Sequence, residues 1–392
     1  MASSFFKRWR DTDTCRCVLH VANLFKQYAR APLPSTAGVL IVTCLRPRNT
    51  LLLGCRDGTI VCEDEGSSGD WYKSHTRICD DEGRPISVWC MAHETTANLM
   101  FLGCYDSYIR IIPAFPPREV LEDKRVPSGG PLLSMAVEDH ILAVGSVDYA
   151  IHMYVADEGL DYLTCIDLRP TRLIFAQPAI QFAEVWCLSY LSRRSPASRI
   201  VCGTGRGSLY EVEETFDAKG WHIGWKPNKT ITMRQGASIF ALSYNEAREN
   251  LALALEDNCV QIHCTISWDC ILRYVFNGDP SHGPESHDNW AVCLHPSQHV
   301  VLVASSRVFV LGEGGLELEP PGMQVYGQVT DATYSEHSEK FFLTTTSGHL
   351  CVLKRDSNEC EACISITNGH HEQGDESGIL RKDVYGILGI TA

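Results

Sequence analysis

The chain lacks any long apolar run. None of its hydrophobic stretches approaches the roughly 18 residues that a membrane-spanning helix needs, so no transmembrane helix and no membrane partner are expected. The first residues, MASSFFKRWRDTD, also lack the long apolar core of a secretory signal. Their basic and aromatic side chains leave organelle import as an alternative, which Asp11 and Asp13 disfavour. We therefore expect a cytoplasmic or nuclear protein.

An excess of positive charge is also missing, since the formal net charge of the 392 residues is −14. This balance argues against broad, non-specific binding to nucleic acid, although it leaves room for a local basic patch. The 18 cysteines suggest disulfides at first sight, but most lie inside apolar stretches, where a thiol behaves as a small buried hydrophobe. So large a domain would not need this many disulfides, and a reducing compartment fits better.

The chain does contain one short sequence motif, the repeated phrase, in seven copies. Each copy has an apolar strand, a tight turn rich in Gly, Asp, Ser and Asn, and a second apolar strand. The turns recur about every 40 to 60 residues, the period of propeller blades, and a unit of that size must stack on its neighbours to bury its apolar face. The copies are LLLGCRDGTI (51–60), MFLGCYDSYI (100–109), ILAVGSVDYAI (141–151), RIVCGTGRGSL (199–209), LALALEDNCV (251–260), VVLVASSRVFV (300–310) and FFLTTTSGHL (341–350).

A further apolar stretch precedes each phrase, as in ISVWCMAH (86–93) and EVWCLSY (184–190), and a fourth strand follows several copies. Four strands and a step to the next unit are typical of a propeller blade. We therefore predict an all-β fold, a seven-bladed β-propeller over residues 38–366, with an N-terminal extension at 1–37 and a C-terminal tail at 367–392. Two segments compete to close the ring. The favoured one is a strand at 15–21, and the other is CISI (363–366); residues 20–31 could instead form an amphipathic helix.

The repeated phrase resembles the WD repeat, and the chain resembles that superfamily over about residues 38–366. Two sets of residues carry the resemblance: the small residue late in the second strand (Gly54, Gly103, Gly145, Gly203) and the aspartate of the turn (Asp57, Asp106, Asp148, Asp257). The Trp-Asp pair that names the family is absent from the ends of the third strands, so no subfamily follows. We expect the turn aspartates to accept backbone N–H bonds and to hold the strand register.

By analogy with that superfamily, the loops between second and third strands share one face with the loops that lead into the first strands. The resemblance therefore implies a rim of Arg56, Tyr105, Tyr149, Arg206, Glu256 and His349. Arg and Tyr dominate binding hot spots, so this rim is the predicted partner-binding surface. Trp89 and Trp186 lie within first strands and are predicted to belong to the core. We expect a non-catalytic scaffold or adaptor that binds protein partners or peptide motifs in a multiprotein complex, with no cofactor and no small-molecule substrate.

Two other functions remain open. A subunit of an RNA-processing or ribonucleoprotein complex would bind through a local basic face, for which the candidates are Arg193, Arg194, Arg199 and Arg206. A propeller hydrolase would need carboxylates or histidines that converge on the central channel, and the apolar first strands offer few.

Two further motifs are weak. Cys360, Cys363, His370 and His371 have the ligand types of a zinc site, but the stretch between the cysteines is predicted to be a strand, so no metal site is expected. Ser195 precedes a proline and follows two arginines, which makes it a candidate phosphorylation site.

Overall fold

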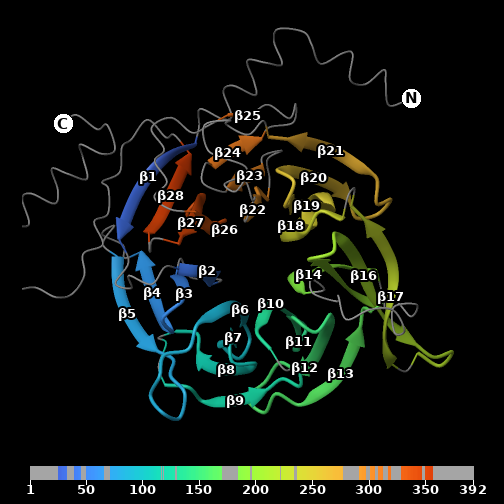
Figure 1. Ribbon diagram of the computed structural model, residues 1–392, viewed down its shortest axis with the longest axis horizontal. Helices are drawn as coiled ribbons and strands as arrows, with labels where there is room; N and C mark the ends of the chain where they lie inside the picture. Colours follow the sequence, from blue (N-terminus) through green and yellow to red (C-terminus); the bar gives the residue numbers. More distant parts are fainter. Residues whose placement is uncertain are drawn as a thin grey trace, which may run out of the picture.

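The backbone forms seven antiparallel sheets of four strands each, arranged around a centre like the blades of a propeller (Figure 1). This confirms the all-β, seven-bladed architecture predicted from the repeats. No helix in the described ranges is long and apolar enough to cross a membrane. The computed structural model describes residues 25–32, 39–45, 50–65, 71–115, 117, 119–128, 130–169, 184–194, 197–220, 222–233, 236–276, 291–296, 301–304, 308–311, 317–318, 328–346 and 349–355.

In every blade the four strands pair in order from the innermost to the outermost. Blade 1 contains β2 (Val39–Leu45), β3 (Thr50–Cys55), β4 (Thr59–Glu65) and β5 (Trp71–Arg77), and blade 2 contains β6 (Val88–Glu94), β7 (Leu99–Cys104), β8 (Tyr108–Pro113) and β9 (Glu122–Arg125). Blade 3 contains β10 (Leu132–Glu138), β11 (Ile141–Ser146), β12 (Ala150–Val155) and β13 (Tyr162–Asp167), and blade 4 contains β14 (Val185–Arg194), β15 (Ala197–Thr204), β16 (Ser208–Phe216) and β17 (His222–Thr232). Blade 5 contains β18 (Ile239–Asn245), β19 (Asn250–Leu255), β20 (Cys259–Cys264) and β21 (Cys270–Val275), and blade 6 contains β22 (Ala291–Leu294), β23 (Val301–Ala304), β24 (Val308–Leu311) and β25 (Glu317–Leu318). Blade 7 contains β26 (Val329–Ser335), β27 (Lys340–Thr345), β28 (His349–Arg355) and β1 (Phe25–Pro32).

The second strands are buried along their length because neighbouring blades cover both of their faces. Every residue of β3 and β7 is buried, and both strands read as continuous apolar runs, as expected for that position. The hydrophobic clusters therefore cross from blade to blade. Leu52 of β3, for example, belongs to the same cluster as Met100 and Leu102 of β7. Burying one such leucine contributes about 2 kcal/mol.

The small residue late in the second strand is explained by this packing. A Cβ atom on Gly203 would lie 2.6 Å from Cys187 Sγ in its own blade and 2.6 Å from Ile239 Cγ2 in the next blade. Both distances are shorter than van der Waals contact. Glycine at this position therefore lets the innermost strand of the next blade approach closely.

The third residue of an innermost strand repeatedly bonds to the next blade. The Ser134 hydroxyl donates to the carbonyl of Val185 at 2.9 Å. At the junction of blade 7 with blade 1, the Asp331 carboxylate accepts from the N–H of Val42 at 2.9 Å, across 289 residues of sequence. Burial outweighs the hydrogen bonds of Asp331 and raises the pKa of its carboxyl to about 7.

The ring is closed by an N-terminal strand, but not the predicted one. β1 pairs with β28 from Phe25 opposite Arg355 to Pro32 opposite His349, and it forms the outer strand of blade 7. The helix considered for residues 20–31 is therefore wrong over the residues of β1. The ring also begins before residue 38, inside the segment assigned to an extension. The alternatives at 15–21 and 363–366 lie outside the described residues.

The cysteines of the apolar stretches are buried thiols outside disulfides, as predicted. In the described ranges these are Cys55, Cys62, Cys90, Cys104, Cys187, Cys202, Cys259, Cys293 and Cys351. Burial raises the pKa of Cys187 to about 12, so this thiol stays protonated and packs as an apolar group.

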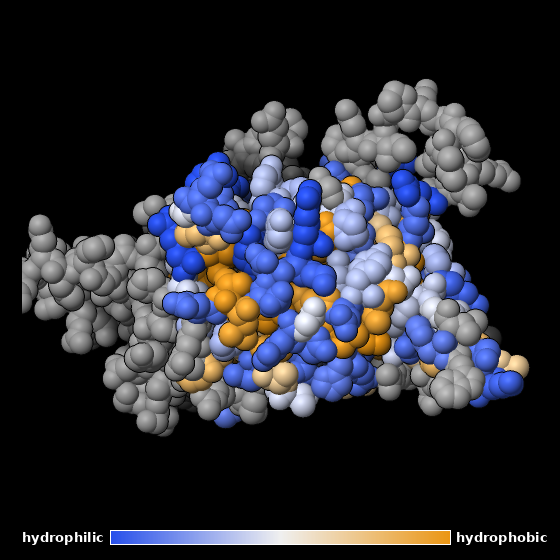
Figure 2. All heavy atoms as spheres, turned by 90° about the horizontal axis from the view of Figure 1, so that it is seen from below, coloured by the Kyte–Doolittle hydropathy of each residue, from blue (hydrophilic) through white to orange (hydrophobic). Residues whose placement is uncertain are grey.

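The outer edge of the ring mixes apolar and charged side chains. Seen edge-on, apolar groups lie scattered among hydrophilic ones (Figure 2). The outer strand β9 is charged throughout, with the sequence EDKR, whereas Leu163 on β13 is exposed. Charged side chains on an outer strand discourage further strand pairing.

Candidate functional site

The turns that join the second and third strands lie at one end of the ring. In blade 2 the first residue of β6, Val88, pairs with the last residue of β7, Cys104, so the turn after Cys104 lies beside the amino end of the innermost strand. The same pairing recurs in blades 1 and 5. We call this end the turn face. It comprises turn residues 56–58, 105–107, 147–149, 205–207 and 256–258, together with the residues that enter the innermost strands.

Serines at the entry to the innermost strands connect neighbouring turns. The carbonyl of Ser87 accepts from the N–H of Tyr105 at 3.0 Å, and its hydroxyl donates to the carbonyl of Arg56 in blade 1. Ser238 repeats this arrangement between blades 5 and 4, where its hydroxyl donates to the carbonyl of Gly205 at 2.9 Å. The positions of these turns are therefore held by hydrogen bonds that cross the blade boundaries.

The predicted rim residues do not all reach the surface of the turn face. Tyr105 is 58% exposed, Arg56 and Glu256 are exposed, and Arg206 is half-buried. His349 is the first residue of β28, and its side chain lies outside the described residues.

Tyr149 is a correction to the predicted rim, because its side chain is only 2% exposed. It occupies the third position of its turn and has a positive φ of 64°. Ser107 and Asn258, at the third positions of their turns, also have positive φ values. Tyr105 instead occupies the first position of its turn. The Tyr149 ring points into the interface with blade 4, where its hydroxyl lies 2.7 Å from that of Tyr210. Burial and the Tyr210 hydroxyl raise the pKa of Tyr149 above its ordinary value.

The innermost strands share an irregularity that the sequence pattern did not predict. In six of them the pairing register shifts at the second residue of the strand, as in a β-bulge, which redirects a side chain. The residues passed over by the pairing are Leu40, Trp89, Leu133, Trp186, Phe240 and Thr330. All of them lie at the turn-face end, and four of the six are large and apolar or aromatic without being fully buried: Leu40, Trp89, Trp186 and Phe240.

Two aromatic pairs result from these bulges. The Trp89 ring lies 5.9 Å from that of Tyr105, and the Trp186 ring lies 5.8 Å from that of Phe240, edge to face across the boundary of blades 4 and 5. The prediction that Trp89 and Trp186 belong to the core is wrong, since both are only half-buried. An aromatic residue directly after the start of the first strand, repeated in VWCM, VWCL and SIFAL, is the signal that could have identified them.

Two of the turn aspartates act as predicted. Asp57 accepts from the N–H of Thr59 at 3.1 Å, and Asp106 accepts from the N–H of Tyr108 at 3.3 Å. Asp106 also forms a bidentate ion pair with Arg110, with N–O distances of 2.9 and 2.6 Å. These carboxylates therefore stabilise the turns.

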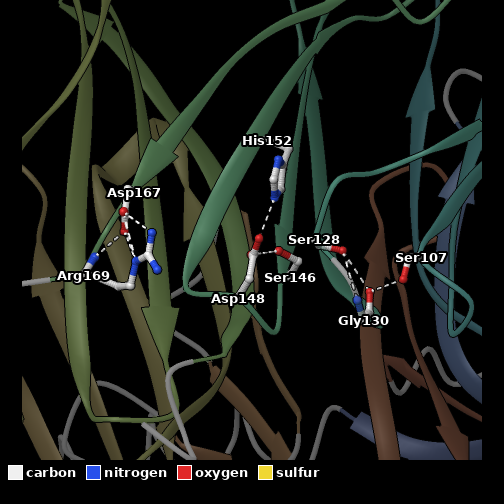
Figure 3. A network of polar contacts seen from close by, with 8 residues as sticks. All are labelled: Ser107, Ser128, Gly130, Ser146, Asp148, His152, Asp167 and Arg169. Atoms are coloured by element: carbon white, nitrogen blue, oxygen red, sulfur yellow. Dashed lines mark hydrogen bonds and ion pairs between the residues drawn. The ribbon is translucent and has the colours of Figure 1, made fainter. Parts of the chain in front are cut away.

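The other two aspartates differ. Asp148 accepts from the Ser146 hydroxyl and lies 3.2 Å from Nε2 of the buried His152 (Figure 3). Burial opposes protonation of His152, but hydrogen bonds and charge from Asp148 and Cys165 outweigh it and raise the pKa of the imidazole to about 9. Asp257 is exposed on the turn face.

Of the candidates for other functions, the structure describes the side chains of Arg199 and Arg206. Arg199, proposed for a basic RNA-binding face, is 1% exposed and paired with Glu211, so it is unavailable to a phosphate. The side chains of Arg193, Arg194 and Ser195 lie outside the described residues, as do Cys360, Cys363, His370 and His371. Among the residues that the structure describes, no group of three potential metal ligands is found.

Comparison with known proteins identifies the fold. No family model and no curated protein matches the sequence. The structure is similar to that of the WD40 β-propeller domain of Doa1, with a TM-score of 0.64 and 12% sequence identity, over 85% of this chain and 98% of that one. Together with the seven four-stranded blades, this similarity shows that the chain has the WD40 β-propeller fold.

Proposed function

We propose that this protein is a non-catalytic scaffold or adaptor that binds protein partners, or peptide motifs within them, through the turn face and its loops. The WD40 fold commonly mediates protein–protein interactions, which supports a binding role.

The observation that carries the proposal is the set of aromatic side chains on the turn face. Trp89 and Tyr105 form one pair and Trp186 and Phe240 the other, and none of the four is fully buried. Aromatic and arginine side chains supply most of the energy of protein interfaces. Arg56 and Arg206 lie on the same face, and the hydrogen-bonded turns present these groups in a fixed arrangement, which lowers the entropic cost of binding.

The experiment is affinity purification of the tagged protein from its native cells, beside the variant Arg56→Glu, Tyr105→Ala, Arg206→Glu. A matched control carries similar changes at exposed residues away from the turn face: Lys226→Glu, Tyr162→Ala, Lys219→Glu. We expect a defined set of proteins that the turn-face variant loses and the control keeps. Retention of the full set by both variants would contradict the proposal.

We also propose a location in the cytosol or nucleus. The buried thiols of the described strands, which form no disulfides there, support a reducing compartment. Fluorescence microscopy of the tagged protein tests this, and accumulation in an organelle would contradict it.

A further inference from the structure

A cavity opens at the end of the ring opposite the turn face. Its volume is about 580 Å³, within the range of pockets that bind ligands. Glu138, the last residue of β10, lines it and pairs with Ile141, the first residue of β11. The cavity therefore lies where the innermost strands end, whereas the turn face lies where they begin. Residues from blades 3 to 7 form its wall.

The lining of the cavity is rich in tyrosines and carboxylates. Tyrosines and glutamates contribute its main polar groups: Tyr190, Tyr244, Tyr334, Glu138, Glu246 and Glu336. Among the described residues that line it, none is a lysine, an arginine or a histidine. We call this site the tyrosine cavity. Three aromatic rings and three carboxylates around one space attract a cation and repel an anion, because both the ring faces and the carboxylates are negative.

The tyrosines are held in place by their own contacts. The Tyr190 hydroxyl donates to the carbonyl of Ile141 at 2.9 Å. Burial raises the pKa of Tyr190 well above its ordinary value, so this hydroxyl stays neutral. The Tyr334 ring lies 4.5 Å from that of His295 and 4.8 Å from that of Phe341.

The wall between blades 5 and 6 is also connected by hydrogen bonds. The side-chain amide of Asn245 donates to the carbonyls of His295 and Pro296, both at 2.9 Å. The Ser243 hydroxyl accepts from the N–H of Leu294 at 2.9 Å. Because these bonds join β18, which carries Tyr244, to the next blade, the chain itself holds this wall in place, which lowers the ordering cost of binding.

We propose that the tyrosine cavity binds the positively charged side chain of a lysine or arginine in a partner peptide. The charged head lies among the tyrosine rings and the carboxylates, and the aliphatic stem contacts the apolar part of the wall, which includes Leu191, Ala247 and Leu294. This site goes beyond the proposed function, since it uses the other end of the ring and a stated side-chain chemistry.

The first experiment presents the full-length protein to an array of nonapeptides. The central residue is lysine, arginine, norleucine or glutamate, and the flanking residues are drawn from Gly, Ala and Ser. We expect at least tenfold more protein on the lysine or arginine peptides than on the norleucine peptides. Equal retention on norleucine, or no retention on any cationic peptide, would overturn the proposal.

Variants then locate the site by isothermal titration calorimetry with the best lysine or arginine peptide. Glu246→Lys with Glu336→Lys should weaken binding at least tenfold, and both residues are exposed, so folding should be preserved. The matched control, Glu122→Lys with Asp123→Lys, changes the net charge equally on β9 and should bind like the unchanged protein. An equal loss in the control would show general electrostatic attraction and overturn the assignment of the site.

A second pair of variants tests the aromatic contribution. Tyr244→Phe keeps the ring face and should keep the affinity within about threefold, whereas Tyr244→Leu should lose at least fivefold. Equal affinities for the Phe and Leu variants would exclude the ring from cation binding. The turn-face variant should bind the cationic peptide normally, so failure of the proposed function and failure of this inference can be told apart.

Discussion

A buried ion pair in blade 4 accepts a hydrogen bond from blade 5 and so connects the two blades. Arg199 on β15 is 1% exposed, and its Nη1 lies 2.8 Å from Oε1 of Glu211 on β16. The other carboxylate oxygen of Glu211 accepts a hydrogen bond from Nε1 of Trp268 at 3.1 Å. Trp268 lies between β20 and β21 and packs in one cluster with residues of both blades. A single carboxylate therefore satisfies a buried cation and a buried donor.

Glu211→Ala removes both interactions. Breaking a buried ion pair from one side costs about 3 to 5 kcal/mol, because it leaves a buried charge without its partner. The lost hydrogen bond of Trp268 shares the same carboxylate, so the two losses are not additive. We expect the free energy of unfolding to fall by about 4 kcal/mol. Arg199→Met with Glu211→Leu removes both charges together and should cost much less than the single substitution.

Urea unfolding followed by circular dichroism measures these differences. Asp167→Ala serves as a control, since it breaks the exposed Asp167–Arg169 pair and should cost no more than about 1 kcal/mol. A loss below about 1 kcal/mol for Glu211→Ala would refute the reasoning. So would a double variant as unstable as the single one.

Three further predictions concern stability. Because His152 has a raised pKa of about 9 in the folded chain, its contribution to the free energy of unfolding is complete below pH 6.5 and is lost as the pH rises to 9. His152→Gln should therefore remove a pH dependence of up to about 3 kcal/mol over that window, as measured by urea titrations. An unchanged pH profile would contradict this. Asp331 has a raised carboxyl pKa of about 7, so its ionisation destabilises the fold as the pH rises from 4 to 7. The Asp331→Asn variant should therefore be more stable than the unchanged protein at pH 8, by more than about 1 kcal/mol. A less stable variant at pH 8 would show that the carboxylate contributes net stability. Gly203→Val inserts atoms where a Cβ alone would lie 2.6 Å from Ile239, and should lower the free energy of unfolding by about 2 kcal/mol or more; a neutral result would mean that blades 4 and 5 can separate at no cost.

The blades and their inner order could be predicted because the information is local. Each strand–turn–strand phrase encodes its own pairing, and the apolar runs mark strands covered on both faces, as in β3 and β7. The roles of Asp57 and Asp106 were predictable for the same reason, since each accepts from a backbone N–H only two residues away.

The closing strand was harder to predict from the sequence because its pairing is not local. β1 reads FKQYARAP, which has no clear alternation, and its partner β28 lies more than 300 residues later. Strand identity there depends on the partner rather than on the segment itself.

The candidate site was predicted only in part because side-chain direction depends on backbone detail. Tyr105 and Tyr149 lie in equivalent turns, but a difference of two positions within the turn makes one exposed and the other buried. The bulges that bring Trp89 and Trp186 to the turn face are shifts of one residue in pairing, which a pattern of apolar residues does not reveal.

Site-specific photocrosslinking in native cells tests the central claim, that the turn face binds protein partners, most directly. A benzophenone side chain is placed at Tyr105 on the turn face and, in a separate variant, at Leu163 on the outer strand β13, which is exposed to a similar degree. We predict discrete crosslinked proteins from position 105 and none of the same set from position 163. Adducts from position 163 alone, or none from position 105, would contradict the claim.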